Sequence, residues 1–123
     1  MELGQDFSLA YAFHWDQPIS TSTQESIAAY GSDEDRIRLA SHSSVTVATL
    51  GLLAMVPSPT VRLAVADNPA TPPEALALIA NDHSRAVRVA GNAAIELLPE
   101  AQRDAARALV ESPMQRLKSR LTA

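Results

Sequence analysis

The sequence predicts an all-α protein, built as a short solenoid of paired helices. Three observations support this fold class: a 26-residue internal repeat, proline-marked helix starts and an alanine-rich composition. The chain of 123 residues contains 22 alanines and only five aromatic residues. Its core must therefore consist of small aliphatic side chains between closely packed helices, and alanine and leucine favour the helix itself. This length fits one domain that covers residues 1–123.

The internal repeat is carried by three arginines. A 26-residue shift places Arg36, Arg62 and Arg88 at one position, and it also aligns Pro73-Glu74-Ala75 with Pro99-Glu100-Ala101. A period of this order made of short helices is typical of a solenoid. Because a helix pair of this size has no core of its own, each unit must bury its apolar side against its neighbours.

Proline positions indicate two helices in each unit. Ser58-Pro59, Thr71-Pro72 and Ser112-Pro113 each place an N-cap residue before a proline at the first helical position. Thr71 and Glu74 also have capping-box spacing, and Asn68-Pro69 separates two successive helices. The expected helices cover residues 23–30, 34–41, 46–55, 59–66, 72–80, 85–92, 99–110 and 113–121.

Charge divides the chain into an acidic head and a mildly basic body. Residues 1–35 hold seven acids and no Lys or Arg, whereas residues 36–123 hold seven acids and ten basic residues. We interpret residues 1–34 as an acidic, aromatic N-terminal cap and residues 35–112 as about three 26-residue repeats. Residues 113–123 then form a C-terminal capping helix.

The composition argues against several functional classes. The chain has no cysteine, which removes disulfides, thiolate catalysis, iron–sulfur clusters and cysteine-ligated zinc. His14, His42 and His83 lack metal-ligand spacing, and the four glycines form no phosphate loop. The first residues, "MELGQDFSLA", do not resemble a signal peptide, and no apolar run approaches the roughly 18 residues of a membrane span. We therefore expect a cytoplasmic protein that is not an enzyme and needs no cofactor, metal or membrane.

Residues 61–88, "VRLAVADNPATPPEALALIANDHSRAVR", resemble the leucine-rich repeat variant family, a HEAT-like group of bacterial repeats. The family pattern has Val-Arg, Val-Ala, Asn-Pro and Thr-Pro in this order, followed by a Leu-rich helix and an Asp before the next Val-Arg. The units at 35–60 and from 87 onward match more loosely. The resemblance implies a right-handed superhelix of short alternating helices whose known roles are mostly surface recognition, although a fold by itself fixes no activity.

The arginine series has two interpretations. In a solenoid, Arg36, Arg62 and Arg88 would form a ladder along one face and present guanidinium groups to a binding partner that is anionic. Alternatively, each arginine braces its repeat by bonding helix-end carbonyls or a nearby acid such as Asp35 or Asp82. We favour the brace, because repeats of this pattern carry the arginine whatever they bind.

Two terminal clusters are further candidates for partner binding. Tyr11, Phe13 and Trp15 fit a strand and a helix equally well. They would cap the exposed end of the first repeat, which we favour, or serve as a protein-binding hot spot. The basic residues of the C-terminal segment would complement the dipole of their helix, which we also favour, or contact phosphate. These basic residues are Arg116, Lys118 and Arg120.

The sequence therefore predicts a non-catalytic helical-repeat module that binds another protein as an adaptor, scaffold or regulator. Self-association into a homo-oligomer is an alternative, because short solenoids expose apolar ends. A second alternative is nucleic-acid binding through the face of Arg36, Arg62 and Arg88. The net charge of −4 and the single lysine argue against it, because domains that contact phosphates are usually basic.

Overall fold

The computed structural model describes residues 15–110, and every regular element in this range is an α-helix. The prediction of an all-α repeat fold is confirmed. The helix expected at 113–121 lies outside the described residues. The observed helices are α2 (Thr21–Tyr30), α3 (Asp33–Ala40), α4 (Val47–Leu53), α5 (Pro59–Asp67), α6 (Pro73–Ala80), α7 (Arg85–Glu96) and α8 (Glu100–Val110).

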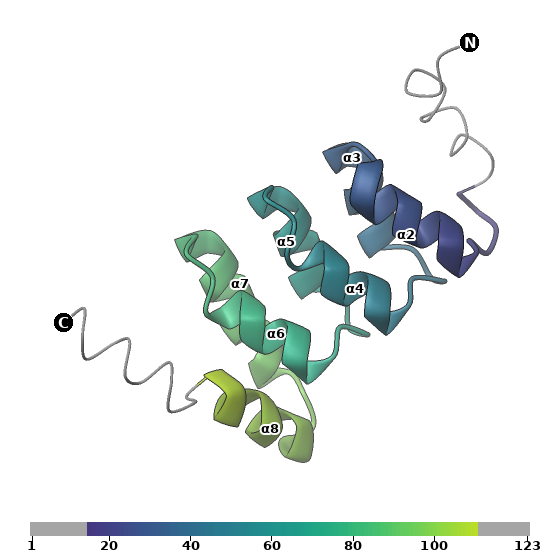
Figure 1. The fold of residues 1–123 in the computed structure, drawn as a ribbon. Helices are drawn as coiled ribbons and strands as arrows, with labels where there is room; N and C mark the ends of the chain where they lie inside the picture. Colours follow the sequence, from purple (N-terminus) through teal and green to yellow (C-terminus); the bar gives the residue numbers. More distant parts are fainter. Residues whose placement is uncertain (1–14, 111–123) are drawn as a thin grey trace, which may run out of the picture.

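The helices form two rows that step along one axis (Figure 1). Row A contains α2, α4 and α6, and row B contains α3, α5 and α7. The row A helices begin at Thr21, Val47 and Pro73, and the row B helices begin at Asp33, Pro59 and Arg85. Both rows thus follow the 26-residue period. Helix α2 also follows this period, although it lies in the segment interpreted from the sequence as the N-terminal cap. Helix α8 follows at the C-terminal end of row A.

The two rows pack differently. In row B, α3 packs against α5 and α5 against α7, whereas α4 and α6 in row A make little direct contact with each other. Buried aliphatic side chains between the rows form the core, among them Leu39, Leu50 and Val65. The space between α4 and α6 is therefore left open at the surface of row A.

Helix α8 is attached to α6 and α7. A small apolar cluster that includes Leu76, Ile95 and Ala106 joins the three helices. Arg107 of α8 adds polar contacts to α7, because its guanidinium donates to Asn92 Oδ1 at 2.7 Å and pairs with the Glu96 carboxylate. The C-terminal end of the described repeat array is therefore held by both apolar and polar contacts.

The predicted capping box at Thr71 is wrong. Helix α6 begins at Pro73 with Pro72 as its N-cap, and the Thr71 hydroxyl instead donates to the Val65 carbonyl oxygen at 2.6 Å. Thr71 is buried, and it satisfies a carbonyl at the end of α5. Two consecutive prolines leave fewer N–H groups to cap at the start of α6, because proline has none.

His42 and Asn68 occupy equivalent positions in successive repeats and make equivalent bonds. Asn68 Nδ2 donates to the Ala40 carbonyl at 2.7 Å, and Asn68 Oδ1 accepts from the Ala70 N–H at 2.7 Å. His42 Nε2 lies 2.5 Å from the Trp15 carbonyl, and Nδ1 accepts from the N–H two residues later, at 3.0 Å. Nδ1 must accept, so the Nε2–H tautomer fits this site. Each side chain ties its turn to the preceding part of the chain.

Candidate functional site

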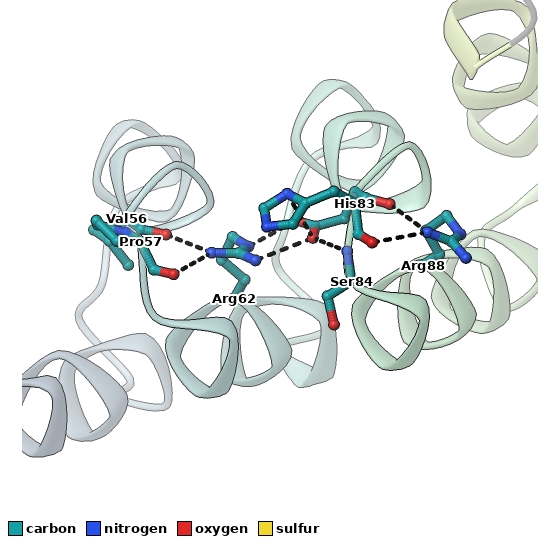
Figure 2. A network of polar contacts seen from close by, with 7 residues as sticks. Val56, Pro57, Arg62, His83, Ser84 and Arg88 are labelled. Carbon is teal, nitrogen blue, oxygen red and sulfur yellow. Dashed lines mark hydrogen bonds and ion pairs between the residues drawn. The ribbon is translucent and has the colours of Figure 1, made fainter. Parts of the chain in front are cut away.

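The arginines of the repeat bond the ends of the row A helices or the turns that follow them. Arg62 belongs to α5 and reaches the turn after α4, where Nη1 donates to the carbonyls of Val56 and Pro57 at 2.7 and 2.8 Å. Its Nε and Nη2 donate to the two carboxylate oxygens of Asp82 at 2.6 and 3.0 Å. Figure 2 shows this network, in which Arg62 lies between Val56 and Pro57 on one side and the turn that carries His83 on the other.

Arg88 and Arg36 repeat part of this arrangement. Arg88 Nη1 donates to the carbonyls of Asp82 and His83 at 2.9 and 3.1 Å, which places both acceptors one full period after those of Arg62. Arg36 donates to the carbonyls of Ala28 and Ala29 at the end of α2, at 3.0 and 3.2 Å, and pairs with the carboxylate of Asp33. Arg36 thus satisfies carbonyls in the last turn of α2, which are groups that a helix leaves unpaired. Arg62 and Arg88 satisfy carbonyls in the turns that follow α4 and α6.

At Arg62 this is the geometry of a brace rather than of an exposed ladder, whereas Arg36 and Arg88 are half-buried. Arg62 is only 4% exposed, so its guanidinium is not available to an anionic partner. Asp82 connects two repeats, because its carboxylate binds Arg62 and its carbonyl accepts from Arg88. Burial raises the pKa of Asp82. The hydrogen bonds from Arg62 and from the Ser84 N–H, together with the positive charge of Arg62, lower this pKa by more than burial raises it. The pKa of Asp82 therefore lies below its ordinary value of 3.8.

Trp15 lies against the first repeat. Its ring is covered by the Arg38 guanidinium at 4.5 Å from the ring centre, and it meets the His42 ring at a centroid distance of 6.1 Å. Such a cation–π contact adds modest stability at a partly exposed site. The other proposed partner-binding aromatics, Tyr11 and Phe13, lie outside the described residues, as do the proposed phosphate-contacting residues Arg116, Lys118 and Arg120.

The most distinctive surface lies on row A and was not predicted from the sequence. Helix α4 and the turn after it expose only apolar or small side chains: Val47, Ala48, Gly51, Leu52 and Met55. Met55 is 66% exposed. The sequence signal that could have indicated this surface is the absence of any charged residue between Arg38 and Arg62. A helix without a charged face is normally buried on all sides, so an apolar helix at the surface of a small solenoid needs a further partner.

These side chains form one wall of a groove of about 520 Å³ between α4 and α6, which we call the row-A groove. Its other wall consists of Pro72, Glu74, Ala75 and Leu78. Glu74 and Leu78 also line a second groove of about 360 Å³, which Leu109 of α8 borders on the far side. Leu78, 54% exposed, therefore stands between two adjoining grooves along row A.

Gly51 lies in the wall of the row-A groove, and no close packing contact requires a glycine at this position. A Cβ atom built at Gly51 meets no other atom within 4 Å. At Gly91 in α7, by contrast, a Cβ would lie 2.7 Å from both the Ala80 nitrogen and Ile79 Cγ2. Gly91 is thus required by the close approach of α6 and α7, whereas Gly51 leaves open space in the groove.

Within residues 15–110, no group of three His, Asp or Glu side chains is placed to hold a metal ion. In the same range, no helix is both long and apolar enough to cross a membrane.

The 26-residue period and its arginine braces define an α-helical repeat protein. Residues 59–84 match the family model described as leucine rich repeat variant. This match confirms the resemblance found in the sequence, and it covers α5, α6 and the turn that carries Asp82. Comparisons with curated proteins and with solved structures gave no match.

Proposed function

We propose that this repeat protein is a non-catalytic module that binds another protein through the row-A groove. The observation that carries the proposal is the concentration of exposed apolar side chains on α4 and α6, on the two sides of one groove. Contiguous exposed apolar surface with a polar rim is typical of protein-interaction sites. The proposal retains the cytoplasmic location and the lack of a cofactor expected from the sequence.

The charge of the groove indicates the chemistry of the partner. Within the described range 15–110, Glu74 is the one charged side chain that lines either row A groove, and it makes no ion pair there. A helix that docks in a groove presents apolar anchors at spacings of three and four residues. We therefore propose a partner segment with such anchors and a Lys or Arg that faces Glu74.

The same observations give less support to nucleic-acid binding. Among residues 15–110, no basic side chain lines the row-A groove, and Arg62 is enclosed by its own repeat. Phosphate contacts need accessible Lys or Arg side chains. The capture experiment therefore includes a nuclease treatment, which detects a nucleic-acid partner.

The test compares two glutamates introduced on different surfaces. Gly51→Glu places a charged side chain in the open space of the groove, whereas Val89→Glu places the same charge on α7, where Val89 is 60% exposed. Both full-length variants and the parent are used to capture partners from a lysate of the source cell, with and without nuclease. We expect a partner that the parent and the Val89 variant capture equally, that the Gly51 variant loses and that nuclease does not release.

Three results would contradict this function. Equal capture by the two variants would show that the groove is not the binding site. Release of the partner by nuclease would favour nucleic-acid binding. Recovery of only a second copy of this chain would indicate self-association in place of a separate partner.

A further inference from the structure

The basic C-terminal segment and the acidic, apolar groove complement each other. We propose that residues 113–121 of the same chain dock in the row-A groove and regulate it by competing with the partner. The competition with a partner rests on the function proposed above, but the docking of residues 113–121 does not. These residues lie beyond the described part of the chain.

The chemistry of the segment fits the groove. Met114, Leu117 and Leu121 recur at spacings of three and four residues, as on one face of a helix. Basic residues alternate with these anchors, and residues 112–123 contain no acid. The groove offers apolar walls and the carboxylate of Glu74 without an ion-pair partner among the described residues. The segment therefore has the apolar anchors and the positive charge expected of the partner.

The described part of the chain ends close to the groove. Helix α8 ends at Val110, and Leu109 borders the second groove, which shares Leu78 with the row-A groove. Packed helices lie about 8–10 Å apart, which places the space between α4 and α6 roughly 15 Å from α8. With residues 113–121 docked as a helix, the three extended steps from Val110 to Pro113 span about 10 Å and the four helical steps to Leu117 add about 6 Å, roughly 16 Å in all. The connection is therefore long enough for docking within one chain.

Tethering makes a weak contact effective. A segment joined by a short linker reaches an effective concentration in the millimolar range. A separate partner must then displace the segment, so the groove responds to partners that bind more tightly than the chain's own C-terminal residues.

The natural absence of cysteine allows a direct test by disulfide formation in the full-length protein. One variant carries Leu78→Cys with Leu117→Cys, and the control carries Val89→Cys with Leu117→Cys. Leu78 and Val89 are similarly exposed, at 54% and 60%. We expect the first pair to form an intramolecular disulfide on the order of tenfold faster than the control, because docking raises the effective concentration. Non-reducing electrophoresis and intact mass measure both the rate and the number of chains.

A charge reversal tests the role of Glu74 in the same assay. Glu74→Lys should slow formation of the 78–117 disulfide several-fold. Glu25→Lys, which makes the same change on α2 away from the groove, should leave the rate unchanged.

Equal rates for the two cysteine pairs, or no disulfide in either, would overturn the proposal. A disulfide that links two chains would overturn it in favour of exchange between copies, and an unchanged rate in the Glu74 variant would overturn the assigned charge pairing. This readout needs no partner. Failure of the disulfide test therefore leaves the partner-binding function standing, and failure of the capture test leaves the docked segment standing.

Discussion

Arg62 and Asp82, 20 residues apart in consecutive helix pairs, form a two-point ion pair with N–O distances of 2.6 and 3.0 Å. Both side chains are buried, with exposed fractions of 5% and 8%. The pair connects the start of α5 to the turn after α6, and it places a charged contact between two repeats. The arginine that recurs along this chain thus acts, at its central position, on the fold itself.

Removal of Arg62 should destabilise the protein more than removal of Arg88. Arg62→Ala leaves the buried Asp82 carboxylate without its ion-pair partner, with the Ser84 N–H still bound, and leaves two carbonyls unpaired. The free energy of unfolding should fall by about 3 kcal/mol. Arg88→Ala removes bonds to two carbonyls and no ion pair, so about 1 kcal/mol is expected. Urea unfolding of both variants measures the difference. Equal losses would show that the ion pair adds nothing to the carbonyl bonds.

Acid should weaken the contribution of Asp82. Because its pKa in the folded protein lies below the ordinary 3.8, the ionised group contributes its full stability above that value and loses it as the pH falls through the lower folded pKa. The difference in unfolding free energy between the parent and Asp82→Asn should therefore be constant near neutral pH and shrink below about pH 4. Urea titrations from pH 7 to pH 3 measure it. A difference that grows in acid would contradict the direction of the shift.

The same substitution at two glycines should have opposite effects. Gly91→Ala forces a Cβ against Ala80 and Ile79 at 2.7 Å, and the resulting overpacking should cost about 1–3 kcal/mol. Gly51→Ala adds a Cβ to open space within α4, where the better helix former should stabilise the protein by about 0.5–1 kcal/mol. Thermal unfolding checks both signs. A loss of stability at Gly51 would mean that the groove wall is closed in solution.

Asparagine should replace His42 with little loss. Asn68 makes the same pair of bonds in the next repeat, so His42→Asn should keep the unfolding free energy within about 0.5 kcal/mol of the parent. His42→Ala removes both of these bonds and the contact of Nδ1 with the Ser44 hydroxyl at 2.8 Å, and it should cost about 1–2 kcal/mol. If the two variants unfold alike, the bonds of the imidazole to Trp15 and Ser44 do not contribute to stability.

The repeat architecture could be predicted from the sequence because its signals are local. Ser58-Pro59 fixes the start of α5 and Asn68 its end, within a few residues of the positions expected. Proline and cap residues act on the backbone beside them, so such boundaries do not depend on distant contacts. Thr71 is the exception, because its hydroxyl found an acceptor six residues away, at the end of the preceding helix.

The row-A groove could not be predicted in the same way. Helix α4 is apolar on all sides, so no hydrophobic periodicity distinguishes Leu53, which is fully buried, from Leu52 and Met55, which are exposed. Only the packing of α4 on row B, with α6 held at a distance, selects the side that meets solvent.

The sequence by itself determined that this chain is all-helical, that it has a 26-residue period and that an arginine recurs at one position. The tertiary structure decided what that arginine does, because its partner Asp82 lies 20 positions later in the sequence and comes close only in the folded repeat array. The tertiary structure also decided which apolar side chains stay exposed in the row-A groove. Local preferences set the helices, but burial depends on how helices distant in the sequence approach one another, and that approach leaves one face of α4 uncovered.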